Sequence, residues 1–122
     1  MINDNMLSGV ASLMAGSTYT VVSHLAFGST TGTLTATDLI TSGEFDRNAI
    51  DSKSATGNVV KYIATRSSTE ANGTTYLNLI GWHNTSTANS SGYMQANFLI
   101  PSLLQTTSFD IEFELWVQFT RG

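Results

Sequence analysis

The sequence predicts a mainly β protein, an antiparallel β-sandwich of about six strands with one short N-terminal α-helix. Residues 108–120 alternate strictly between apolar and polar side chains, and a β-strand sends successive side chains to opposite faces. Further apolar and β-branched segments recur along the chain between turns rich in Gly, Asn and Ser. No glycine-rich phosphate loop and no alternation of strand and helix patterns is present, which argues against a nucleotide-binding α/β fold.

The composition limits the classes of protein to which the chain can belong. The 122 residues suffice for one domain with a core, and we expect residues 1–122 to form a single domain. The chain has no cysteine, so neither disulfides nor thiolate metal sites contribute. The net charge is −4 and the five basic residues are scattered, so we expect no nucleic-acid binding. No apolar run is long enough to span a bilayer and the N-terminus lacks a basic signal-peptide region, so we expect synthesis in a cytoplasm and no membrane insertion.

The N-terminal segment predicts a helix over about residues 4–15. Asn3-Asp4-Asn5 offers candidate N-cap side chains, and Gly16 follows the helix where a C′ glycine would stand. An isolated helix this short is marginal in water, so it must dock. It either covers one end of the sheet or lies in a subunit contact. Its apolar residues at helical spacing, the interface candidates, are Met6, Leu7, Val10, Leu13 and Met14.

The strands follow in six segments. We expect a polar turn at 52–57, and an antiparallel hairpin whose loop contains Asn72-Gly73. Pro101 lacks a backbone N–H and should end the fifth strand. The last strand should place its apolar face on the core. The expected strands are 21–28, 44–50, 58–66, 74–82, 93–100 and 108–120, the third and fourth forming the hairpin.

The polar face of the last strand carries Asp110, Glu112 and Glu114. These carboxylates either bind a divalent cation, particularly if subunits meet around an axis, or form a solvated acidic face that discourages edge-to-edge aggregation. Trp116 shares this face. It is either packed within its own chain or buried at a subunit interface.

A second cluster flanks the polar loop before the fifth strand. Trp82, His83, Asn84 and Tyr93 combine aromatic rings with hydrogen-bonding groups. Such a platform could stack on a sugar; the alternative is an ordinary hairpin end.

Catalytic patterns are lacking. There is no cysteine nucleophile and no Gly-x-Ser-x-Gly elbow, and neither His24 nor His83 has an HxH or HExxH partner. We therefore expect no enzymatic activity, no cofactor and no zinc site.

Several short motifs occur along the chain: Leu25-Ala26-Phe27-Gly28, Thr37-Asp38-Leu39, Glu44 with Arg47, Glu70-Ala71-Asn72-Gly73 and Leu79-Ile80-Gly81-Trp82. Together these motifs resemble a family of small bacteriophage and prophage structural proteins. The chain departs from the family pattern at Asn78, where the family has an acidic residue, and at Trp82, where it has Phe. The resemblance implies a virion part on a tail, tail fibre or capsid exterior, and no enzyme.

Two functional hypotheses result. The first is a structural virion protein of a tailed phage, a small assembly or decoration subunit on the tail (fibre, baseplate or adaptor) or capsid exterior. It would be made in the host cytoplasm, contact other virion proteins and assemble as a homo-oligomer. By analogy with phage fibres, one expected form of this homo-oligomer is a trimer. The alternative is a carbohydrate-binding module that recognises a host surface glycan through the Trp82–Tyr93 cluster.

Overall fold

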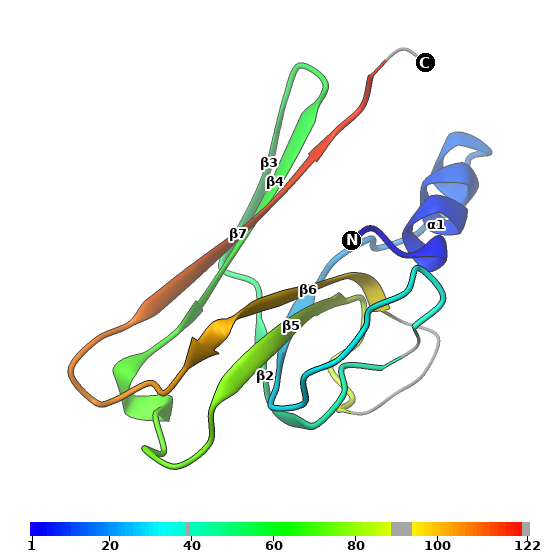
Figure 1. The fold of residues 1–122 in the computed structure, drawn as a ribbon. Helices are drawn as coiled ribbons and strands as arrows, with labels where there is room; N and C mark the ends of the chain where they lie inside the picture. The colour runs from blue at the N-terminus through cyan, green and yellow to red at the C-terminus, as the bar shows by residue number, and fades with distance from the viewer. Residues whose placement is uncertain (39, 89–93, 121–122) are drawn as a thin grey trace.

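The computed structural model describes residues 1–38, 40–88 and 94–120. Leu39 of the motif above and Tyr93 of the predicted sugar-binding cluster lie outside these residues. Within them the chain forms two antiparallel sheets, of order β2-β1-β5-β6 and β3-β4-β7 (Figure 1), which confirms the predicted fold class. The elements are α1 (Asp4–Met14), β1 (His24–Gly28), β2 (Glu44–Ala49), β3 (Ser52–Thr56), β4 (Val59–Arg66), the 3-10 helix η1 (Ser68–Glu70), β5 (Leu77–His83), β6 (Met94–Leu103) and β7 (Ile111–Gln118).

Strand β3 was not predicted from the sequence. The segment was expected to be a polar turn, but it pairs with β4 from Ser52 opposite Ile63 to Thr56 opposite Val59. All five of its residues are exposed, so its sequence carries no alternation. The turn itself falls at Gly57, which has a positive φ of 60°.

The expected hairpin between 58–66 and 74–82 is wrong. β4 pairs with β3 and β7, whereas β5 pairs with β1 and β6, so the two strands lie in different sheets. Asn72-Gly73 does form a turn, in which the Asn72 Oδ1 accepts hydrogen bonds from two following backbone N–H groups. That turn redirects the chain from one sheet to the other.

Strand β6 continues past the point where it was expected to end. Leu79 pairs with Leu99 and Leu77 with Leu103, so 100–102 bulge opposite the single residue Asn78. Pro101 lies in this bulge. Because β6 is also at the edge of its sheet, the missing N–H of the proline does not interrupt a central ladder.

The alternation of the last strand is borne out in its centre. Leu115 is buried, and Phe113 and Val117 are partly buried against the core. Phe109 and Phe119 lie beyond the ends of β7 and are exposed.

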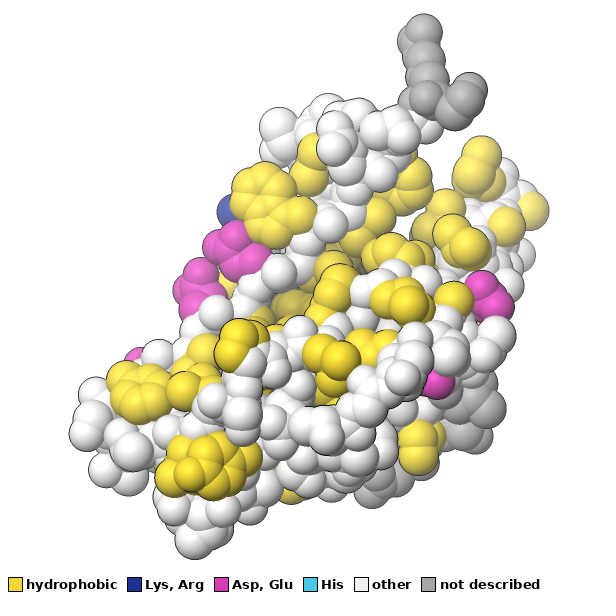
Figure 2. All heavy atoms as spheres, viewed as in Figure 1, with side chains coloured by type: hydrophobic (Ala, Val, Ile, Leu, Met, Phe, Trp, Pro, Cys, Tyr) yellow, Lys and Arg dark blue, Asp and Glu magenta, His cyan; other side chains and the backbone are white. Residues whose placement is uncertain are grey.

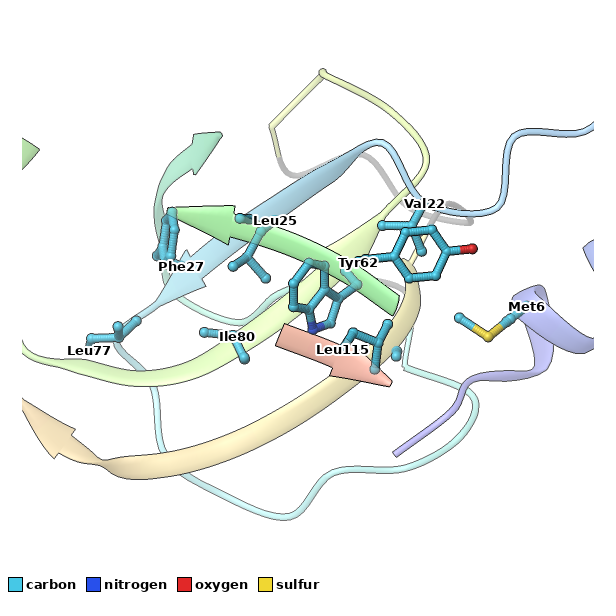
Figure 3. Packing of buried hydrophobic residues seen from close by; sticks show 11 residues of the cluster. Met6, Val22, Leu25, Phe27, Tyr62, Leu77, Ile80 and Leu115 are labelled. Atoms are coloured by element: carbon cyan, nitrogen blue, oxygen red, sulfur yellow. The ribbon is translucent and has the colours of Figure 1, made fainter. Parts of the chain in front are cut away.

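The core lies between the two sheets (Figure 3). Trp82 and Phe27 are its largest fully buried side chains. The Phe27 and Phe113 rings, one from each sheet, lie with their centroids 5.8 Å apart. Met6 of α1 extends the same cluster at one end.

Helix α1 lies at one end of the sandwich (Figure 1), where residue Ile2 forms a β-bridge with Ala96 of β6. Asn3 occupies the N-cap position, but its side chain makes no capping hydrogen bond. Gly16, with a φ of 88°, ends the helix as predicted. Gly9 is required by packing, because a Cβ there would lie 2.0 Å from the Tyr19 ring. In the described residues, no helix has the length and apolar character needed to cross a membrane.

Candidate interaction surfaces

The expected sugar platform does not form at Trp82 and His83, because both side chains are fully buried. Trp82 lies on β5 between Leu25 of β1 and Ala96 of β6. The imidazole Nε2 of His83 hydrogen-bonds the Thr41 hydroxyl at 2.8 Å. Neither ring can therefore stack on a sugar in solution. Of the described residues of this cluster, only Asn84 reaches the surface, and it is half-buried.

The environment of His83 keeps its imidazole neutral. Burial, reinforced by the positive charges of Arg47 and His24, lowers the pKa of His83 to about 3. Burial and the Arg47 charge also lower the pKa of His24. These histidines do not combine with other ligand types into a metal site among the residues that the structure describes.

Glu44 and Arg47 form an ion pair, and the pair is buried. Their side chains are only 1% and 4% exposed. The Glu44 carboxylate accepts hydrogen bonds from Arg47 Nη2 at 2.7 Å and from Nε at 2.8 Å. The remaining Arg47 Nη1 donates to the Thr85 carbonyl. The pair thus stabilises β2, an edge strand of the four-stranded sheet.

Arg66 is a second buried cation, one that the sequence interpretation missed. Its guanidinium pairs with Asp46 of the other sheet and donates to the Glu70 carbonyl. It also lies 5.2 Å from the Phe27 ring centroid and 5.3 Å from that of Phe45. Strand alternation could have predicted the burial of Arg66, because Arg66 falls on the same face of β4 as the buried Tyr62 and Ala64.

The three carboxylates of the last strand are not brought together as a metal site. Asp110 lies before β7 and accepts a hydrogen bond from the Ser68 backbone N–H at 2.6 Å. Glu114 accepts one from the Trp116 indole at 2.7 Å. Glu112 is exposed on the outer face of β7. Among the described residues no group of three or more acidic or histidine side chains has the arrangement of a metal site.

Trp116 is not packed within its own chain: 60% of the residue is exposed. The ring borders a hollow of about 340 Å³ on the outer face of the three-stranded sheet. The ammonium group of Lys61 lies over the ring, 5.2 Å from its centroid. We call this surface the Trp116 platform, and its lining residues are Ser54, Thr56, Val59, Lys61 and Trp116.

A different, apolar hollow separates α1 from the end of the three-stranded sheet. Figure 2 shows hydrophobic side chains gathered in this recess. Its volume is about 190 Å³. Of the five predicted helix contacts, Met6 belongs to the core, whereas Leu7, Leu13 and Met14 remain exposed. We call this surface the helix groove, and its lining residues are Met6, Val10, Leu13, Val21, Val60, Tyr62, Val117 and Phe119.

A third hollow, of about 250 Å³, lies beside the loop between β1 and β2. Buried Asn97 lines it and donates to the Asp38 carboxylate at 3.0 Å, while its own Oδ1 has no partner among the described residues. A hydrogen bond from the Thr35 backbone N–H lowers the pKa of the Asp38 carboxyl. Because that carboxylate is already hydrogen-bonded to Thr35 and Asn97, the hollow offers hydroxyl and amide groups to a ligand.

No protein-family model, curated protein or solved structure matches this chain. The chemistry of its surfaces therefore carries the functional argument.

Proposed function

We propose that this protein is a structural subunit that self-assembles through the helix groove and forms part of a phage virion. The apolar groove is the observation that supports self-assembly. All eight side chains that line it are apolar or aromatic. Exposed apolar surface of this kind marks a contact that is completed by another protein.

The apolar stripe of α1 is wider than the part that its own chain covers. Met6 is buried and Val10 packs on the core. Leu7 and Met14, two helical turns apart, lie on one line beside Val10. They are 63% and 86% exposed. The helix therefore presents a line of exposed apolar side chains along one rim of the groove.

A second copy of the chain is the partner that fits this arrangement. The exposed apolar side chains of α1 border the hollow between α1 and the three-stranded sheet. A two-fold axis beside α1 therefore lets the Leu7 and Met14 side chains of each copy enter the groove of the other. Such an isologous contact is self-complementary. The trimer expected for a phage fibre would instead need a heterologous contact around a three-fold axis.

The virion location is supported by the resemblance described above. Two of its glycines have packing roles here: a Cβ on Gly28 would lie 2.5 Å from the Ser42 carbonyl oxygen, and one on Gly81 would lie 2.0 Å from the Thr41 hydroxyl. Mass spectrometry of purified particles from a lysate tests the location. Detection of the chain at many copies per particle is expected, and its absence from particles contradicts the virion proposal.

Sedimentation velocity over a wide concentration range tests the assembly. We expect a dimer that dissociates on dilution, and a monomer at all concentrations for Leu7→Glu and Met14→Glu. Ser8→Glu adds the same charge to an exposed position on another side of the helix and is the matched control. A wild-type chain that remains monomeric at the highest concentration contradicts the proposal. A dimer that neither Leu7→Glu nor Met14→Glu dissociates also contradicts the proposal.

A further inference from the structure

We propose that the Trp116 platform binds a neutral hexopyranose unit of a polysaccharide, with the Trp116 ring as its stacking surface. This binding activity is separate from assembly through the helix groove. It places sugar recognition on the outer face of the three-stranded sheet, away from the buried Trp82 and His83.

The strand register builds the platform. Ser54 on β3, Lys61 on β4 and Trp116 on β7 are directly opposite one another. The adjacent row on the other face contains the buried Tyr62 and Leu115, so the row with Trp116 points outward. Three strands spaced about 4.8 Å apart give the row a span of about 10 Å. This is wide enough for one or two sugar rings.

Two charged side chains hold the Trp116 ring in place. Its indole N–H donates to the Glu114 carboxylate at 2.7 Å. The Lys61 ammonium lies over the ring at 5.2 Å from the centroid. A ring fixed before binding loses little conformational freedom when a ligand stacks on it, which favours affinity. The platform is thus preorganised although it is exposed.

The side chains around the ring match a sugar better than a protein core. The Trp116 ring and Val59 supply apolar surface for the C–H face of a pyranose. The hydroxyls of Ser54 and Thr56 and the Lys61 ammonium supply hydrogen-bonding partners for its hydroxyl groups. The helix groove, in contrast, has no polar lining residue other than the Tyr62 phenol.

The charges favour a neutral sugar over an anionic one. Lys61 and Glu114 place one positive and one negative group beside the ring. Glu112 adds a further negative charge on the same outer face of β7. The whole chain carries a net charge of −4, which repels polyanions at long range.

Tryptophan fluorescence and calorimetric titration test the site. The probes are hexasaccharides of glucose, galactose and mannose, with oligogalacturonate as the anionic comparator, each up to about 20 mM, well above a weak Kd of about 1 mM. The chain has two tryptophans, of which Trp82 is fully buried, so a ligand-induced fluorescence change reports on Trp116. We expect at least one neutral hexasaccharide to bind.

Trp116→Ala should abolish this binding, or weaken it more than tenfold, and leave the circular dichroism spectrum and the sedimentation coefficient unchanged. Tyr76→Ala removes another half-exposed aromatic ring and should bind like the wild type. The proposal is overturned if no neutral probe binds, if Trp116→Ala binds equally well, or if only oligogalacturonate binds. It is also overturned if Trp116→Ala dissociates the dimer, because Trp116 would then belong to the subunit contact.

Discussion

The buried Glu44–Arg47 pair makes a quantitative prediction about stability. Arg47→Met removes the cation that pairs with the Glu44 carboxylate, whose side chain is 1% exposed. Breaking a buried ion pair in this way typically lowers the free energy of unfolding by about 3–5 kcal/mol. With an m value of about 1.5 kcal/mol per M, the urea midpoint should fall by about 2–3 M.

The double variant separates the pair from the packing. Glu44→Met combined with Arg47→Met replaces both charged groups with hydrophobic side chains of similar size, and replacing a buried ion pair by well-packed hydrophobic residues is often close to neutral in stability. We therefore expect the double variant to regain most of what Arg47→Met loses. The remaining deficit should reflect the hydrogen bond from Arg47 to the Thr85 carbonyl.

Urea denaturation followed by tryptophan fluorescence measures these values, since unfolding exposes the buried Trp82. Glu112→Gln, which neutralises an exposed carboxylate on the outer face of β7, is the control and should change the midpoint little. A loss below about 1 kcal/mol for Arg47→Met would refute the reasoning. A double variant no more stable than Arg47→Met would refute it as well.

Three further predictions concern buried residues. Because the pKa of His83 is lowered from 6.5 to about 3, the unfolded chain binds a proton there that the folded chain does not, and stability should fall from about pH 6.5 toward pH 3; His83→Gln should flatten that slope in urea titrations at several pH values. Gly81→Ala should lower the free energy of unfolding by about 1–3 kcal/mol, because its Cβ would meet the Thr41 hydroxyl. Arg66→Met should lower it by about 2–3 kcal/mol, and Arg66→Lys by less, in thermal melts.

Each of these has an outcome that contradicts it. A pH slope unchanged in His83→Gln would mean that another group titrates. Wild-type stability of Gly81→Ala would mean that the segment at Thr41 moves aside freely. Equal losses for the two Arg66 variants would mean that the charge contributes nothing beyond the shape of the side chain.

The candidate surfaces were only partly predictable from the sequence. Helical spacing identified the apolar residues of α1, and strand alternation placed Trp116 on the polar face of the last strand. The position of Trp82 and His83 next to a polar loop suggested that their side chains are exposed, yet both side chains are buried. The reason is that β5 is a central strand, paired on both sides. Whether a strand is central depends on the strands that pair with it, and these can lie far away in the chain.

The sequence by itself determined the fold class, the helix and most strand positions, because alternation and helical spacing are local patterns that the backbone geometry imposes. Only the tertiary structure decided which strands pair, that β3 exists and that β4 and β5 lie in different sheets. It also decided which polar groups are buried. His83 meets Thr41 across 42 positions of sequence, and Arg66 meets Asp46 across 20. Such partners are set by long-range packing, which no local pattern contains.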